Sequence, residues 1–287
     1  MNELIHKLIK DHLKWEIADI SIEYQSDGLT NQNYVVSKGD IKYAIRISGT
    51  NASNLGINRY AELASMEVVS EIGIGAEIVY FSTGTGNMIT KFIDGRKWTN
   101  EDVGTTENMK RIADTLRKVH SLTAIPYEFS PYKDIEDRIQ FAIQNHLELP
   151  DYLDTLIAKL YTIKEEREQH KQLYIGLCHN DPFPNNFLDD GTVRLIDWEY
   201  AGMGDIFFDL SCACVSYSPA MKEDFLRHYF GQCELDTLKS LEQMSFVVTF
   251  WNAMWAVLQT QVNVLNDDYI KMAEHMFLQL KQTVLES

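Results

Sequence analysis

The stretch that most constrains this chain spans residues 178–200 and reads CHNDPFPNNFLDDGTVRLIDWEY. It opens with a His-Asn-Asp turn that places Asp181 five residues before Asn186. The Asp-Asp-Gly at 189–191 is typical of the tight turn of a hairpin, and a short apolar run after it leads to a second acid, Asp197. The pattern therefore predicts Asp181 and Asn186 on a loop before a hairpin, and Asp197 at the end of its second strand.

Three such oxygen-bearing side chains suit phosphoryl transfer. This chemistry needs a carboxylate that receives the hydroxyl proton and oxygen ligands that hold Mg²⁺ on the phosphates. Asp181 suits the first role, and Asn186 and Asp197 suit the second. The protein-kinase pattern H-R-D-x-x-x-x-N followed by D-F-G has the same spacing, and here it reads H-N-D-x-x-x-x-N and then D-W-E. The alternative is a polar surface loop before an ordinary hairpin.

The net charge of −16 argues against a nucleic-acid partner, because phosphate backbones are bound by clusters of Lys and Arg. Residues 1–17 predict an amphipathic helix rather than a signal peptide. The four cysteines form no CxxC pair, so zinc is not expected and we predict buried thiols in a reducing cytosol: Cys178, Cys212, Cys214 and Cys233.

No charged residue lies between Glu242 and Asp267, which is long enough to span a bilayer. Six Asn and Gln side chains interrupt this stretch, so we expect a buried helix and no membrane span.

Alternation, turn residues and helical periodicity predict a mostly antiparallel sheet with one inserted helix, followed by a mainly helical part. Strands are expected at 20–24, 34–37, 41–47, 78–81 and 87–92, with helices at 1–16 and 57–72. After a hinge at 93–96, helices are expected at 106–121, 134–147, 151–170, 205–217, 219–230, 235–264 and 267–285. The inserted helix is expected to bury one apolar stripe: Ala61, Ala64, Val68 and Ile72.

Arg46 is the one basic residue of its apolar strand, and a half-buried cation needs a partner. Glu62 and Glu67 in the following helix are the candidates. A kinase lobe uses such a cation on the α- and β-phosphates, held by a helix carboxylate. The alternative is a structural salt bridge.

The loop 28–33 lies between the first two strands, where a kinase fold covers the phosphates, although it lacks the G-x-G-x-x-G pattern. Thr30, Asn31 and Asn33 are expected to donate side-chain hydrogen bonds there. The alternative is a capped polar turn.

Trp251 and Trp255 lie four residues apart on a predicted helix, so their rings share one face. With Tyr200 they could enclose a quaternary ammonium through cation–π attraction, and Glu199 could add a carboxylate. The alternative is plain core packing.

Three other polar residues are expected to brace the structure. His179 should hydrogen-bond to backbone rather than take part in the chemistry. Asp209 lies inside an apolar run and should accept backbone hydrogen bonds from the catalytic loop, and Asp205 should cap a helix.

Eight segments match one known family, in family order: DGLTNQNYVV (27–36), YAIRIS (43–48), NRYAELASMEVVSEIGIGAE (58–77), MITKFIDGR (88–96), LRKVHSL (116–122), HNDPFPNNFL (179–188), LIDWEYAGMGDIFFDL (195–210) and FWNAMWAVLQ (250–259). Through them the chain resembles bacterial choline kinases of the choline/ethanolamine kinase and aminoglycoside phosphotransferase superfamily. The resemblance implies a two-lobed, protein-kinase-like α+β fold. Its antiparallel-sheet, nucleotide-binding lobe would span 1–92, and its mainly helical catalytic and substrate-binding lobe would span 93–287.

The resemblance also implies roles for single residues. It makes Asp181 the base, Asn186 and Asp197 the Mg²⁺ ligands, and Arg46 with Glu62 the pair beside the ATP phosphates. It places a hinge that faces adenine at 89–92, with Ile89, Lys91 and Phe92. It implies a substrate pocket that draws on Glu199, Tyr200, Trp251 and Trp255.

We therefore predict a cytoplasmic, ATP- and Mg²⁺-dependent kinase that phosphorylates the hydroxyl of choline. No A-P-E activation segment is present to hold a peptide, which favours a small-molecule acceptor. Ethanolamine, thiamine or an aminoglycoside are alternative acceptors for the same chemistry. A catalytically inactive nucleotide-binding scaffold is the alternative from a different class.

Overall fold

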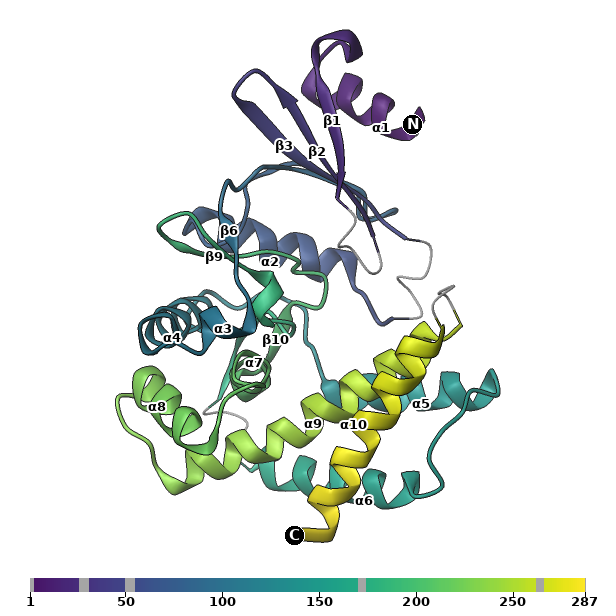
Figure 1. Cartoon of the computed structure of the whole chain (residues 1–287), viewed down its shortest axis with the longest axis vertical. Helices are drawn as coiled ribbons and strands as arrows, with labels where there is room; N and C mark the ends of the chain where they lie inside the picture. The colour runs from purple at the N-terminus through teal and green to yellow at the C-terminus, as the bar shows by residue number, and fades with distance from the viewer. Residues whose placement is uncertain (1–2, 26–30, 50–54, 170–173, 262–265, 287) are drawn as a thin grey trace.

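The computed structural model describes residues 3–25, 31–49, 55–169, 174–261 and 266–286, and its two chain ends lie at opposite ends of the molecule (Figure 1). The N-terminal part is a five-stranded antiparallel sheet in the order β1-β2-β3-β5-β4. Its elements are α1 (Glu3–Leu8), a π-helical turn (Ile9–Leu13), β1 (Ser21–Gln25), β2 (Gln32–Lys38), β3 (Ile41–Ile47), α2 (Arg59–Glu71), β4 (Ile78–Phe81) and β5 (Met88–Lys91).

The remainder is mainly helical and lies below the sheet in Figure 1, which confirms the predicted fold class. Its helices are α3 (Asn100–Val103), α4 (Thr106–His120), α5 (Pro131–Gln144), α6 (Leu153–Glu168), α7 (Ile206–Ala213), α8 (Pro219–Phe230), α9 (Leu235–Gln259) and α10 (Asn266–Glu286). Its short strands are β6 (Arg96–Lys97), β7 (Ile175–Cys178), β8 (Phe187–Asp189), β9 (Val193–Leu195) and β10 (Gly202–Asp205).

Two apolar cores hold these parts together. The smaller core joins the N-terminal helix, as its amphipathic pattern predicts, to the sheet through Ile5, Leu8, Ile9, Val36, Ile45, Ile47 and Ile89. The larger core fills the helical part and includes Met66 and Val69 of α2. The helix α2 therefore packs its buried face toward the helical part of the molecule.

The predicted apolar stripe of α2 is partly wrong. Ala61 is buried as expected, but Ile72 is 43% exposed. The helix instead buries Glu62, Ser65, Met66 and Val69. The buried face is rotated because it includes Glu62, whose side chain forms an ion pair beneath β3. Hydrophobic periodicity does not predict the burial of a charged residue.

The long stretch before Asp267 forms α9, which ends at Gln259 rather than continuing to 264. In the described part of the chain, no helix has the length and apolar character needed to cross a membrane. Cys178, Cys212 and Cys214 are buried as predicted, whereas Cys233 is only partly buried.

Candidate active site

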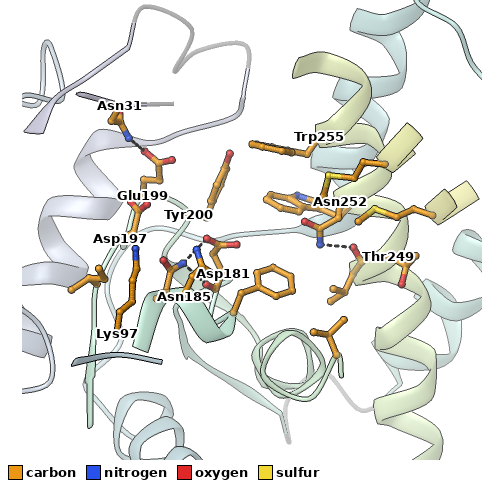
Figure 2. Close-up of a pocket in the computed structure, with 18 of the residues that line it drawn as sticks. Asn31, Lys97, Asp181, Asn185, Asp197, Glu199, Tyr200, Thr249, Asn252 and Trp255 are labelled. Atoms are coloured by element: carbon orange, nitrogen blue, oxygen red, sulfur yellow. Dashed lines mark hydrogen bonds between the residues drawn. The ribbon is translucent and has the colours of Figure 1, made fainter. Parts of the chain in front are cut away.

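The hairpin of β8 and β9 brings the three predicted polar residues together. Asn186 ends a short 3₁₀ turn and donates its Nδ2 to the Asp181 carbonyl and to Asp181 Oδ2, both at 2.8 Å. The Ile196 amide donates to the Asn186 carbonyl at 3.1 Å, so the residue before Asp197 is tied to the loop. All three side chains line one pocket, in which Figure 2 shows Asp181 and Asp197. The predicted arrangement of loop, hairpin and second acid is confirmed.

Two residues of this site have left-handed backbone conformations, which are uncommon outside glycine. Asn180 has φ 64° and Asp197 has φ 67°. Asn180 is held by its Nδ2, which donates to the Tyr200 carbonyl at 2.9 Å. Backbone strain of this kind persists where the surroundings over-determine it, and it concentrates at functional sites.

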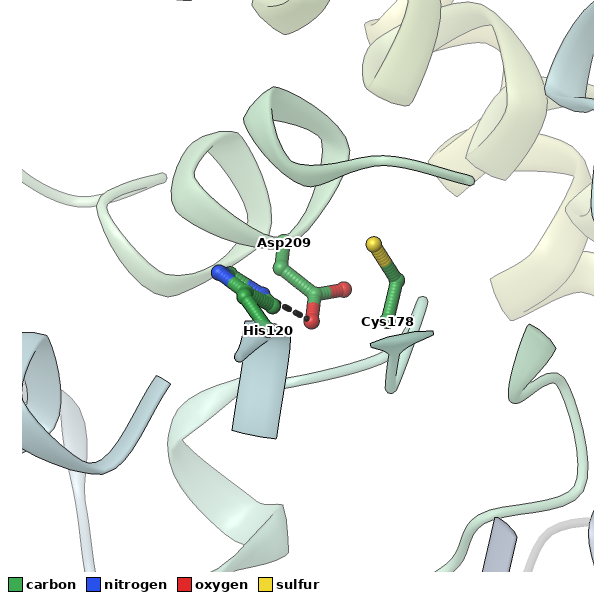
Figure 3. A group of neighbouring side chains, drawn as sticks. All are labelled: His120, Cys178 and Asp209. Atoms are coloured by element: carbon green, nitrogen blue, oxygen red, sulfur yellow. Dashed lines mark hydrogen bonds and ion pairs between the residues drawn. The ribbon is translucent and has the colours of Figure 1, made fainter. Parts of the chain in front are cut away.

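One buried acid holds the backbone of the loop before Asp181 in place. Asp209 of α7 is fully buried and accepts from the His179 amide at 2.8 Å and from the Asn180 amide at 2.6 Å. Its Oδ2 also lies 3.0 Å from His120 Nε2 (Figure 3). The predicted bracing role of Asp209 is confirmed, and His120 is a partner that the sequence did not reveal.

His179 is also a brace, as predicted. Its Nδ1 accepts from the Asp181 amide at 3.2 Å, and its Nε2 lies 2.9 Å from the Ile196 carbonyl. Burial lowers the pKa of His179, so the ring is neutral and Nε2 carries the proton. Asp205 caps α7 as expected, since its Oδ1 accepts from the Phe207 amide.

Cys178 lies beside His120 and Asp209 (Figure 3), and the three could share a metal ion by proximity alone. Burial and the Asp209 charge raise the pKa of the Cys178 thiol well above its usual range. Since metal ligation needs the thiolate, and since Asp209 already accepts hydrogen bonds from the loop, this cluster is structural.

The acids of this pocket lie close together and disfavour one another's charge. Burial, followed by the charges of Asp197 and Glu199, raises the pKa of Asp181 well above its usual range. Partial burial and the charge of Glu199 likewise raise the pKa of Asp197 to about 7, although Arg46 opposes the shift. A cation placed among these carboxylates would stabilise their charged forms.

The donor set at this position fits Mg²⁺, which prefers oxygen ligands. Asp197 lines the pocket with a carboxylate, and Asn186 lines it with an amide whose donor end is committed to Asp181. The amide oxygen is therefore the end that a cation would meet. Their ligand roles stay predictions.

Arg46 lines a second cavity, of about 280 Å³, together with other residues of the sheet and of the hairpin. Its Nη1 lies 2.5 Å from Glu62 Oε1, so Glu62 and not Glu67 is the partner. Its Nε and Nη2 both donate to the Gly86 carbonyl. Burial disfavours the charge, but the carboxylates of Glu62, Glu199 and Asp197 together more than offset this and raise the pKa of Arg46.

Sequence reasoning missed Arg59, the first residue of α2. This buried side chain donates from Nη1 to Glu62 Oε2 at 2.6 Å and lies 3.3 Å from Glu199 Oε2, while its Nη2 donates to Ser48 Oγ at 2.6 Å. Arg59 thus joins α2 to the segment that follows Asp197. The one sequence feature that marks Arg59 is its position directly after the helix cap Asn58. That feature does not indicate a contact with Glu199, 140 positions away.

The hinge prediction needs a correction. Ile89 is fully buried in the smaller core, and Lys91 pairs at the surface with Glu77 at 2.6 Å, so neither side chain lines the cavity. Side chains alternate along a strand, and β5 turns Met88 and Thr90 to the cavity instead. Of the three predicted residues, only Phe92 lines it.

The structure describes only part of the predicted phosphate-binding loop at 28–33. Thr30 lies outside the described residues. Asn31 and Asn33 line both cavities, and Asn31 donates to Glu199 Oε2 at 3.2 Å. Hydrogen bonds from these two residues to phosphate stay predictions.

The pocket around Asp181 has a volume of about 400 Å³ and extends to α9 and α10. Tyr200 and Trp255 line it as predicted, with Tyr200 between the acids and Trp255 in Figure 2. The Tyr200 hydroxyl is buried and has no hydrogen-bond partner among the described residues.

Trp251 also lines the pocket but is 2% exposed and belongs largely to the core. The Arg138 guanidinium lies 3.9 Å from its ring centroid, and Trp251 Nε1 donates to Asp134 Oδ2. One ring face is therefore already in contact with a cation, which favours the core-packing alternative for this tryptophan. Glu199 likewise lines the pocket, although Arg59 and Asn31 bind its carboxylate.

Comparison with known proteins points to one family. The family model for choline/ethanolamine kinase matches residues 22–243. Protein LicA of Haemophilus influenzae is 26% identical over 196 residues, which cover 67% of this chain and 57% of LicA. Ethanolamine kinase 2 of Rattus norvegicus is 21% identical, with 92% of this chain and 76% of that protein covered. The chain thus matches little more than half the length of one relative and about three quarters of the other.

The fold is also that of a solved structure. The choline/ethanolamine kinase family protein from Mesorhizobium loti superposes with a TM-score of 0.81 and 24% identity, over 99% of this chain and 95% of that one. At this identity the likeness concerns the fold alone.

Proposed function

The chain belongs to the choline/ethanolamine kinase family, and from this we propose that it transfers the γ-phosphoryl group of ATP to the hydroxyl of choline. The proposal assigns the cavity around Arg46 to the nucleotide and the cavity around Asp181 to the acceptor. It also keeps the predicted division into a nucleotide-binding lobe at 1–92 and a catalytic lobe at 93–287.

The observation that carries the choice of choline is the distribution of charge in the acceptor cavity. Its three lining acids, Asp181, Asp197 and Glu199, come from the loop before β8 and the segment after β9, and Asp197 also lines the nucleotide cavity. The opposite wall comes from α9 and α10 and includes Trp255, Met272 and Met276, with no acid among its described residues.

A quaternary ammonium suits such a wall because it has no N–H group to satisfy. Aromatic faces attract it through cation–π interaction, worth about 0.5–2 kcal/mol each. A primary ammonium has three N–H donors, and burying them without acceptors is unfavourable. This difference favours choline over ethanolamine.

In the proposed reaction Asp181 orients the hydroxyl and accepts its proton as the oxygen attacks. The Asn186 hydrogen bond to Asp181 Oδ2 holds the carboxylate in place. Mg²⁺ held by Asn186 and Asp197 would neutralise charge on the phosphates. Arg46, steadied by Glu62, faces the α- and β-phosphates.

Ethanolamine remains the second candidate on one specific observation. The buried Tyr200 hydroxyl is unpartnered among the described residues and could accept from a primary ammonium. Asn252 and Thr249 add polar atoms to the same cavity.

The test is ADP release from Mg-ATP with choline, ethanolamine, thiamine or kanamycin as acceptor. We expect selective turnover of choline, and we expect Trp255→Ala to raise its KM about ten-fold with little change in kcat, since about 1.4 kcal/mol of cation–π attraction is lost. Tyr161→Ala, an exposed aromatic residue on α6, is the control and should leave both constants unchanged. Preference for ethanolamine would discard the aromatic site, and turnover of no acceptor would discard the kinase proposal.

A further inference from the structure

We infer that Lys97 is a further catalytic residue whose ammonium contacts the transferring γ-phosphoryl group. The inference deepens the proposed function and rests on it. No motif marked this lysine, and its position in the fold is what points to the role.

The hairpin of β8 and β9 holds the backbone of Lys97 in place. β6 pairs antiparallel with β8, with Lys97 opposite Leu188, and the Trp98 amide donates to the Phe187 carbonyl at 3.0 Å. Phe187 directly follows Asn186, so the strand that carries the lysine is fixed against the loop that carries the predicted metal ligand.

Alternation along β6 then decides which side chain enters the site. Arg96 turns outward and forms a two-point ion pair with Asp102, at 2.7 and 2.8 Å. Lys97 turns the other way and lines the pocket, where Figure 2 shows its side chain rising toward Asp197.

Lys97 belongs to the small set of residues that line both cavities. The others described are Asn31, Asn33, Ile196 and Asp197. The γ-phosphoryl group leaves the nucleotide and joins the acceptor, so it has to pass where the two cavities meet. Lys97 is the one cation of this shared set in the described part of the chain.

The charges that line the acceptor cavity support this assignment. Asp181, Asp197 and Glu199 line the acceptor cavity, and Lys97 is the basic residue among its described lining. Of the two buried arginines near the site, Arg46 lines only the nucleotide cavity and Arg59 lines neither cavity.

The catalytic loop offers no substitute, since its residues 182–185 read Pro-Phe-Pro-Asn. Positive charge directed at the transferring group is a principal source of rate acceleration in phosphoryl transfer. Within this site, the chain provides it through Lys97.

In the step itself, the acceptor oxygen forms a bond to the γ-phosphorus while the bond from that phosphorus to the β,γ-bridging oxygen breaks. The electron pair of the broken bond stays on that oxygen, which becomes part of ADP. The hydroxyl proton passes to Asp181. Lys97 keeps its proton and balances the negative charge on the oxygens of the group in transfer.

The test compares Lys97→Met with Arg96→Met, its neighbour on the same strand. We expect Lys97→Met to lower kcat about 10²–10³-fold with little change in the acceptor KM, as for loss of one charge-stabilising donor. Lys97→Arg should recover part of the rate. Arg96→Met should leave kcat within about two-fold, and thermal unfolding should show that both variants remain folded at the assay temperature.

Binding gives a second measurement that needs no acceptor. Because Lys97 contacts the γ-phosphoryl group, Lys97→Met should weaken Mg-ATP about ten-fold while leaving Mg-ADP unchanged. Equal weakening of ATP and ADP, or a kcat within three-fold of the parent, would overturn the inference. If the parent protein turns over no acceptor, the proposed function fails, and the ratio of ATP to ADP affinity still decides whether Lys97 meets the γ-phosphate.

Discussion

Replacing Asp209 by asparagine tests whether the loop that carries Asp181 depends on one buried carboxylate. In the structure its two oxygens accept from three donors: the Asn180 amide at 2.6 Å, the His179 amide at 2.8 Å and His120 Nε2 at 3.0 Å. An amide side chain offers one oxygen instead of two. If that oxygen keeps Asn180, the new NH₂ group faces the His179 N–H, and two donors oppose each other.

The expected loss follows from these contacts. Hydrogen bonds to a charged group contribute about 1.5–3 kcal/mol each, and at least one is lost and another loses its charge. Removal of the buried charge recovers part of its desolvation cost. We therefore expect Asp209→Asn to lower the free energy of unfolding by about 3 kcal/mol and to reduce kcat, because Asp181 follows directly on the displaced amides.

The assay is urea unfolding followed by circular dichroism, together with ADP release. The control is Asp224→Asn, an exposed acid of α8 that pairs with Arg227, for which the change should stay within about 0.5 kcal/mol. An Asp209→Asn protein that unfolds within about 1 kcal/mol of the parent would show that the loop holds its shape without this brace.

Two further predictions concern stability. Gly56 has φ 75°, and a Cβ there would overlap the Asp134 carboxylate, so Gly56→Ala should lower the free energy of unfolding by about 1–3 kcal/mol. The loss should clearly exceed that of Gly39→Ala, where φ is also positive but the space is open. Equal effects of the two substitutions in thermal unfolding would refute the overlap. Arg111 binds Asp189 at two points, each 2.7 Å, and these hydrogen bonds lower the pKa of that acid. Since the folded pKa lies below the unfolded value of about 3.9, the pair stabilises above that pH and its effect is lost as pH falls through the folded pKa. Arg111→Gln should therefore lower the free energy of unfolding by about 1 kcal/mol at pH 7, and urea titrations should show the difference shrinking at pH 3; a difference independent of pH would contradict the assignment.

Most of the fold could be predicted from local features of the sequence. The strand at 41–47, the strand at 78–81 and the helix at 219–230 have the predicted bounds, because turn residues and caps mark their ends. The hairpin that delivers Asp197 was predictable for the same reason, since Asp-Asp-Gly specifies a tight turn whatever surrounds it.

What could not be predicted depends on contacts between distant segments. Arg59 and Glu199 are 140 positions apart, and a lone arginine at a helix start carries no sign of its partner. The error at Ile89 and Lys91 has a different origin. A strand presents two faces, and its sequence pattern does not say which face meets a ligand when both are partly covered.

The tryptophans show the same limit on a helix. Trp251 and Trp255 share a face, yet only Trp251 is held against Arg138 and Asp134 of α5. Spacing places two rings together, whereas the neighbouring helix determines which ring is left for a ligand.

The position of α2 has a consequence for motion. Its inner residues belong to the larger core, its first residue is bound to Glu199, and the Leu195 amide of β9 donates to the Ile74 carbonyl just beyond its end. The helix is thus anchored at both ends to the part of the molecule that carries the acceptor cavity. Any movement of the five-stranded sheet relative to the helical part would leave Glu62 behind with the helix. Arg46 belongs to β3 of the sheet, so such a movement would stretch its ion pair with Glu62, together with the Arg59–Ser48 and Asn31–Glu199 hydrogen bonds.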